Sequence, residues 1–154
     1  MKLQDLLTPS AVKVVGSASS KKRLIHDLAD LAETAHGLPA SPVVNALMER
    51  EALGPTGVGH GVALPHARIP GLEHVRGVFV RLEKPIDFDA VDRQPVDLVF
   101  ALFAPEEAGV EHLKALALVS RSLRDGALCS KLRANDDAST LYTILTATES
   151  VAAA

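Results

Sequence analysis

The segment TGVGHGVALPHAR, residues 56–68, places a histidine directly after a proline at the end of a glycine-rich track. Its three alternating glycines allow the backbone to adopt positive φ or to approach another surface closely. Pro65 fixes its own φ and favours an extended conformation at the residue before it. The side chain held at the end of this track is His66, the one group here whose type can be neutral and nucleophilic near pH 7.

His66 could act as a nucleophile, as a metal ligand, or only as a structural residue that caps a turn. The adjacent residues alone do not decide among these three roles. The track lacks the lysine of a nucleotide phosphate-binding loop and leads into no helix, which disfavours a nucleotide site. The spacings of His60, His66 and His74 do not match common zinc patterns, so no metal is expected. The G-x-S-x-G motif of serine hydrolases is absent.

A second histidine, His112, lies in the helical pattern GVEHLKALALVSRSL. Ala115, Leu116, Val119 and Leu123 share its face at helical spacing. Two interpretations stay open: a histidine satisfied within the core, or an imidazole that reaches the reacting centre from a rigid helix.

Arg50, in MEREALG, precedes the glycine track by six residues. It is either a solvated residue at a helix end or a positive charge that lies over the loop. The other histidines and the nearby glutamates are expected at the surface or in loops: His26, His36, His60, His74, Glu49, Glu51, Glu106, Glu107 and Glu111.

Hydrophobic periodicity and capping residues predict the elements that position these side chains. Helices are expected over 3–7, 20–36 (with Ser19 or Ser20 as N-cap and Gly37 as the stop), 42–53 (with Ser41 as N-cap), 110–123, 127–133 and 138–146. Strands are expected over 11–15, 61–64, 75–82 and 96–104, the last buried on both faces. The glycine track is expected to be an irregular loop and residues 84–95 a turn-rich connection. This order predicts a mixed α/β fold, one sheet with helices on its faces, in a single domain over residues 1–148 with a frayed tail over 149–154.

Composition narrows the class of protein. Aromatic residues make up only 3%, so the core is expected to consist of Leu, Val and Ala. A net charge of −3 gives no support for nucleic-acid binding. The single cysteine, Cys129, excludes an internal disulfide and fits a reducing compartment. No apolar run reaches membrane-spanning length and no signal peptide is evident, so a cytoplasmic location without stable membrane insertion is expected.

Three stretches together resemble a known family: REALGPTGVGHGVALPHAR, LEKPIDFDAVDRQPVDLVFALFAP and EHLKALALVSRSLRD. They are similar to the IIA component of the bacterial phosphoenolpyruvate-dependent phosphotransferase system, in its fructose, mannitol and nitrogen-regulatory class. The resemblance covers nearly the whole chain, and its R-E-x-x-x-x-T-G-x-G-x-G-x-A-x-P-H signature is highly specific. The single domain and the sequences GVGHGVALPH and KPIDF look most like the nitrogen-regulatory branch of this family.

The resemblance implies a mixed, mostly five-stranded sheet flanked by helices, and phosphotransfer without a cofactor. It implies that His66 accepts and donates the phosphoryl group, that His112 stabilises the phosphate, and that Arg50 stabilises its charge. One departure is Ala67-Arg68, where many relatives have Gly-Lys. Arg68 keeps the positive charge but presents a planar fork, which bears on partner preference.

Three functions are therefore considered. The first is a phosphoryl carrier that is loaded by a histidine-containing phosphocarrier protein and acts on nitrogen or other metabolic regulatory targets. The second is a IIA component that passes phosphate to a fructose or mannitol permease, and the third is a binding module with a structural histidine. Partner docking is expected over four apolar residues that could instead be ordinary core: Val58, Val62, Leu64 and Ile69.

Overall fold

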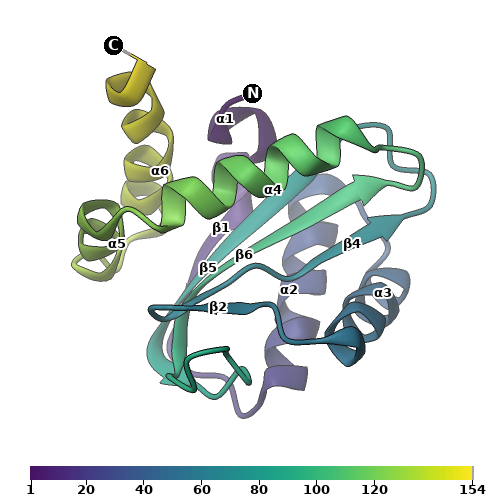
Figure 1. Ribbon diagram of the computed structural model, residues 1–154, viewed down its shortest axis with the longest axis horizontal. Helices are drawn as coiled ribbons and strands as arrows, with labels where there is room; N and C mark the ends of the chain where they lie inside the picture. Colours follow the sequence, from purple (N-terminus) through teal and green to yellow (C-terminus); the bar gives the residue numbers. More distant parts are fainter. Residues whose placement is uncertain (154) are drawn as a thin grey trace.

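The chain folds around one mixed β-sheet that carries helices on both faces (Figure 1). Its strands are β1 (Val12–Val15), β2 (Gly57–Gly59), β3 (Val62–Ala63), β4 (His66–Ile69), β5 (Arg76–Ile86) and β6 (Val96–Pro105). They lie in the order β1-β5-β6-β3-β2, and β4 also pairs with β6. Because β5 runs antiparallel to β6 while β3 and β4 run parallel to it, the predicted mixed α/β class is confirmed.

The helices follow the predicted order. They are α1 (Leu3–Leu6), the 3-10 turn η1 (Pro9–Ala11), α2 (Lys21–His36), α3 (Ala40–Leu53), α4 (Val110–Leu123), α5 (Gly126–Arg133) and α6 (Ala138–Ala153). The computed structural model describes residues 1–153, with side chains through residue 147. A frayed tail is expected over 149–154. The backbone through residue 153 is described as part of α6, whereas the side chains of this tail and the whole of residue 154 lie outside the described part. None of the described helices is both long and apolar enough to cross a membrane.

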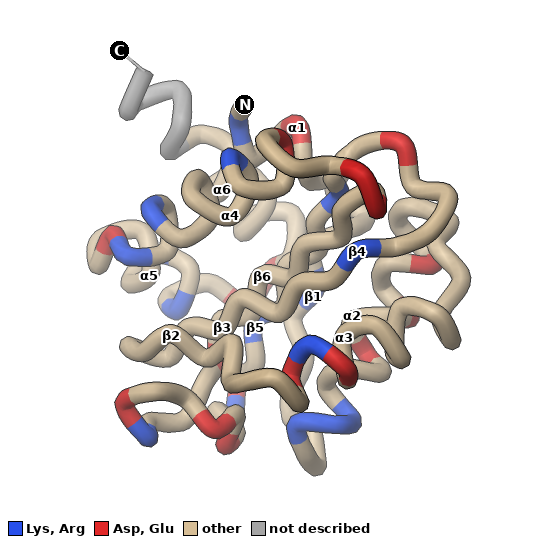
Figure 2. The backbone as a smooth tube through the Cα atoms, turned by 45° about the vertical axis from the view of Figure 1, so that its right-hand side comes forward, with Lys and Arg blue, Asp and Glu red and all other residues tan. Residues whose placement is uncertain are grey.

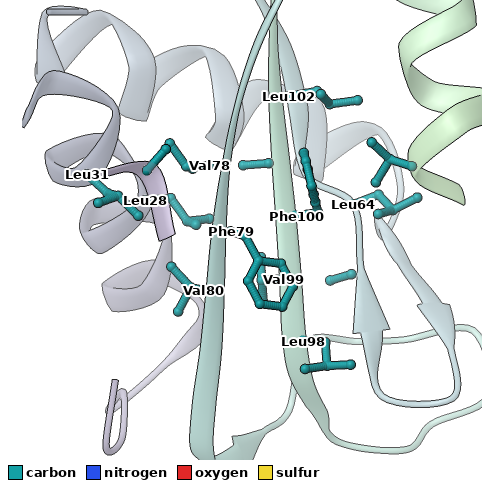
Figure 3. Close-up of a cluster of buried hydrophobic side chains, with 14 of the residues drawn as sticks. Leu28, Leu31, Leu64, Val78, Phe79, Val80, Leu98, Val99, Phe100 and Leu102 are labelled. Atoms are coloured by element: carbon teal, nitrogen blue, oxygen red, sulfur yellow. The ribbon is translucent and has the colours of Figure 1, made fainter. Parts of the chain in front are cut away.

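Strand β6 forms the centre of the core, as its unbroken apolar run predicts. It pairs with β5 along most of its length, and the two faces of this pair are both covered. On one face Val78 and Val80 lie toward Leu28 of α2, while Phe100 and Leu102 point to the opposite face (Figure 3). All five of these side chains are fully or almost fully buried. The sheet is therefore a rigid central layer to which the loops at its edges are attached.

The parallel neighbour of β6 is broken into two short strands, β3 and β4, on either side of Leu64 and Pro65. Proline has no N–H to donate to a ladder. The Pro65 carbonyl still accepts the Leu102 N–H at 2.9 Å. Six strands thus occupy the five positions that were expected, because two of them share one place beside β6.

The predicted cap of α3 is wrong by two residues. The helix begins at Ala40, so that Ser41 and Pro42 lie in its first turn, where proline is tolerated because the N–H groups there lack intrahelical partners. The cap comes instead from the preceding helix, since Glu33 Oε2 accepts the Ala40 N–H at 3.3 Å. Ser20, by contrast, caps α2 as predicted, and Gly37 ends it with φ of 70°.

The glycine track is a β-hairpin and not the irregular loop that was expected. Strands β2 and β3 pair antiparallel, and the turn between them places His60 and Gly61 at φ of 57° and 79°. Two consecutive positive φ values are typical of the tight turns that join twisted strands. Strand β5 likewise extends to Ile86, into the segment that was expected to be a connection.

The outer side of β2 is covered by the loop that precedes β6. Val91 donates its N–H to the Gly57 carbonyl at 3.2 Å, and Asp92 Oδ2 accepts the His60 N–H at 3.0 Å. The loop lies so close that a Cβ atom added to Gly57 would stand 2.8 Å from the Cα of Ala90. Glycine at position 57 is therefore required by backbone approach.

Replacing Gly57 by alanine is expected to destabilise the protein by about 1–3 kcal/mol, because the new methyl group overpacks against Ala90. The matched control is Gly126→Ala at the start of α5, where an added Cβ meets nothing within 4 Å. That change should be neutral or stabilise by about 0.4–1 kcal/mol. Chemical denaturation midpoints measure both, and equal stabilities for the two variants would contradict the close approach.

Candidate functional site

His66 is the first residue of β4 and is half-buried. Its Nδ1 lies 2.9 Å from the carbonyl oxygen of Leu64, two residues earlier. A carbonyl oxygen only accepts hydrogen bonds, so Nδ1 must carry the hydrogen. In the neutral ring the lone pair is then on Nε2, and the backbone fixes which nitrogen is nucleophilic.

Arg50 approaches the other side of the same ring from the last turn of α3. Its Nε lies 3.3 Å from His66 Nε2 and donates to it. Its Nη1 donates to the Gly54 carbonyl at 3.0 Å, which fixes the guanidinium against the turn that follows the helix. The two partners of His66 indicate the same tautomer, because a guanidinium N–H can donate only to a lone pair on Nε2.

His112 lies in the first turn of α4, and its ring centroid is 5.7 Å from that of His66 with the planes at 69°. It is 7% exposed, and its Nε2 has no hydrogen-bond partner among the described residues. Burial lowers the pKa of His112 below the ordinary 6.5, and the electrostatic influence of His66 and Arg68 lowers it further. A neutral imidazole with an unpaired, buried nitrogen therefore faces the nucleophilic ring.

These residues line one open hollow of about 700 Å³. Its walls are formed by Ala46, Glu49, Arg50, Ala52, Leu53, His66, Ala67, Arg68 and His112. The structure thus brings together all three predicted site residues, from three separate elements. Two cationic side chains and two imidazoles, against the single carboxylate of Glu49, make the hollow suited to an anion.

Arg68 is a member of this hollow that the sequence reasoning did not assign to it. Residues two apart on a strand share a face, so His66 and Arg68 of β4 both lie on the exposed side. Arg68 Nη1 donates to the carbonyls of Glu106 and Ala108, at 2.7 and 3.1 Å, in the loop before α4. The alternation of the strand is the signal that could have identified it.

Two expectations about surface residues are wrong. Glu51 was expected to be solvated, yet its side chain is only 6% exposed, in an ion pair with Lys21. His36 was expected at the surface, yet its Nε2 donates to the Gly77 carbonyl at 2.8 Å and is partly buried. Each carries a polar contact to a residue far away in the chain, which local patterns do not reveal.

The expected docking residues are also mostly wrong, since Val62, Leu64 and Ile69 are buried in the core. Three exposed apolar side chains belong to α3 and α4, the helices that carry Arg50 and His112: Leu53, Val110 and Leu113, at 85%, 67% and 68% exposure. Leu53 lines the hollow itself, and the other two flank His112 on α4. Lys and Arg positions are interspersed with Asp and Glu positions along the described backbone (Figure 2).

Comparisons with known proteins place this chain in a family. Residues 5–148 match the model of the phosphoenolpyruvate-dependent sugar phosphotransferase system, EIIA 2. A nitrogen regulatory protein of Bradyrhizobium diazoefficiens is 48% identical over 145 residues, which span 94% of this chain and 95% of that protein. A fructose-specific EIIA component of Haloferax volcanii is 32% identical over 149 residues, 94% of this chain and 97% of that protein.

The fold agrees with that assignment. The crystal structure of the nitrogen regulatory protein IIA-Ntr from Neisseria meningitidis superposes with a TM-score of 0.84 at 36% identity, covering 94% of this chain and 99% of that one. The family model spans every element from α1 into α6, including the three that carry His66, His112 and Arg50. The chain therefore belongs to the EIIA 2 family of the phosphoenolpyruvate-dependent sugar phosphotransferase system.

Proposed function

We propose that this protein is a phosphoryl carrier that accepts a phosphoryl group on Nε2 of His66 from a histidine-containing phosphocarrier protein. The observation that carries the proposal is the hydrogen bond from Nδ1 to the Leu64 carbonyl, which leaves the lone pair on Nε2. That lone pair faces the hollow in which a guanidinium and a second imidazole are gathered. No metal or nucleotide takes part in the proposed step.

The step exchanges one N–P bond for another. The bond between the phosphorus and the donor imidazole breaks and leaves its electron pair on the donor nitrogen, while the Nε2 lone pair of His66 forms the new bond. Charge on the three transferring oxygens is stabilised by positioned donors. Arg50 Nε–H supplies one donor once its hydrogen bond to His66 Nε2 is broken. The unpaired Nε2 of His112 supplies another in the tautomer that carries the hydrogen on that nitrogen.

The partner reaches His66 over the exposed apolar rim formed by Leu53, Val110 and Leu113. Leu53 lines the hollow, and the other two belong to α4, the helix that carries His112. Transient complexes bury small interfaces in which a few apolar side chains carry most of the affinity. The same rim serves the donor protein and whichever acceptor follows it.

A regulatory role, in which the phosphorylation state governs binding to nitrogen or other metabolic targets, is supported by the relatives. Identity is 48% to a protein named as nitrogen regulatory and 32% to one named as fructose-specific. Delivery of phosphate to a fructose- or mannitol-type permease is the second candidate, favoured by that fructose-specific relative. Sugar uptake by a deletion strain separates the two, since only the second predicts its loss.

Incubation with phosphoenolpyruvate, enzyme I and the small phosphocarrier protein is expected to produce acid-labile phosphate on the wild type and none on His66→Ala. Arg50→Ala and His112→Ala should each slow labelling, through a loss of roughly 2–4 kcal/mol of transition-state stabilisation. Labelling is followed by quenched-flow and mass spectrometry. Undiminished labelling of His66→Ala would favour the third candidate, a binding module with a structural histidine.

Charge on the apolar rim is expected to impair docking. Leu53→Asp and Leu113→Asp should raise the KM for the phosphorylated donor by roughly tenfold each, as for a central contact worth more than 1 kcal/mol, with kcat little changed. Val91→Asp is the matched control, because Val91 is 75% exposed and does not line the hollow. Equal KM values for all three variants would show that the partner binds elsewhere.

His112 is expected to titrate below 6.5 in the free protein, because burial disfavours its charged form. Since its folded-state pKa lies below the unfolded value, it makes the folded state less stable as the pH falls below 6.5. Phosphorylation of His66 should raise this pKa, because the phosphate places negative charge beside the ring. NMR titration of the histidine ring signals measures both values. A midpoint that phosphorylation leaves unchanged would remove His112 from contact with the phosphate.

A further inference from the structure

A buried carboxylate lies directly beside the site and is not used by the proposed chemistry. The side chain of Glu51 follows Arg50 on α3 and is 6% exposed. Its Oε2 lies 2.7 Å from Lys21 Nζ and also accepts the Thr56 N–H at 3.4 Å. The Thr56 hydroxyl donates to Oε1. A buried charge with several committed partners holds those partners in place.

Thr56 connects this carboxylate to the catalytic histidine through the backbone. It is 4% exposed, and its carbonyl accepts the Leu64 N–H at 2.9 Å. The Leu64 carbonyl in turn accepts Nδ1–H of His66 at 2.9 Å. An unbroken series of hydrogen bonds therefore runs from Lys21 through Glu51, Thr56 and Leu64 to His66. We refer to these five residues as the orienting chain.

Both ends of the orienting chain are fixed. Lys21 lies 3.5 Å from Asp89 Oδ2, and its Nζ is 4.7 Å from the centroid of the buried Phe88 ring, so its ammonium group is committed on three sides. At the other end Arg50, the neighbour of Glu51 in α3, donates to His66. Consecutive residues of α3, Arg50 and Glu51, thus contact His66 itself and Thr56, whose carbonyl holds the orienting residue Leu64.

We infer that Glu51 is a positioning residue for phosphotransfer, which acts with Lys21 and Thr56 to place the Leu64 carbonyl and so to keep the lone pair of His66 on Nε2. This inference rests on the proposed function of His66. It differs from a merely stabilising role of Glu51, which would pin α3 to α2 without any effect on the imidazole. Outer hydrogen-bond partners fix ring tautomers in this way at metal-binding histidines.

The test separates orientation from stability. Glu51→Gln removes the charge, and Thr56→Val removes the hydroxyl donor, whereas Thr56→Ser keeps it. Asp137→Asn is a matched control, since Asp137 Oδ2 accepts both the N–H and the hydroxyl of Thr140 in the same pattern at the start of α6, away from the hollow. If Thr56→Val does not fold, Lys21→Met weakens the orienting chain from its other end.

Two readouts are made at equal folded fraction. The first is the tautomer of His66 in the unphosphorylated protein, from nitrogen-15 NMR of the ring at pH 8. The second is the rate of His66 phosphorylation by the phosphocarrier protein. Glu51→Gln and Thr56→Val should shift the ring toward a mixture of tautomers and slow phosphorylation by roughly tenfold or more, as for outer partners at metal sites. Thr56→Ser and Asp137→Asn should match the wild type in both.

The inference is overturned if Glu51→Gln unfolds more easily but keeps the wild-type tautomer and rate, because Glu51 is then only structural. It is equally overturned if Asp137→Asn changes the tautomer as much as Glu51→Gln does. A wild type that is never phosphorylated, but whose tautomer responds to Glu51→Gln, rejects the proposed function while it supports the orienting role. The failure of one is therefore distinguishable from the failure of the other.

Discussion

The site depends on one hydrogen bond between a side chain and the backbone only two residues away. The Leu64 carbonyl accepts a hydrogen bond from His66 Nδ1–H. The lone pair of the neutral ring is therefore on Nε2, in a residue that lines the hollow. A backbone carbonyl is a better orienting group than a mobile side chain, because its direction is set by the strands that contain it. Here Pro65 holds the chain extended between the two partners, and its own carbonyl is bonded to β6.

The rest of the fold brings two further groups to that ring from distant parts of the chain. Arg50 comes from α3 on the side of the turn before β2, and His112 from the first turn of α4. Both helices are anchored to the same central layer, α3 through β4 and α4 through β6. The cations Arg50 and Arg68 outnumber the one carboxylate in the lining of the hollow, Glu49, and this excess of positive charge suits a ligand that arrives with its own negative charge.

Most of the helices and strands could be predicted from local sequence patterns. The features that were mispredicted depend mainly on contacts that those patterns do not record. The apolar run over β6 and the caps of α2 are local signals, and they predicted their elements well. The start of α3 was misplaced because its first N–H is capped by an acceptor from another helix, Glu33 Oε2. The burial of Glu51 was missed because its ion-pair partner is Lys21, thirty residues earlier, although its other partner, Thr56, is only five residues later. The glycine track was taken for a loop because glycine weakens every strand pattern, although its turn needed the positive φ of Gly61.

The loop that covers β2 has a consequence for how this molecule meets others. An open sheet edge offers a row of backbone donors and acceptors to which a foreign strand can be added. At this edge the Gly57 carbonyl and the His60 N–H are already taken by Val91 and Asp92. A foreign strand therefore finds these two groups occupied, and contacts on the side of the sheet that bears the glycine hairpin are left to side-chain surfaces, which separate more readily than paired strands.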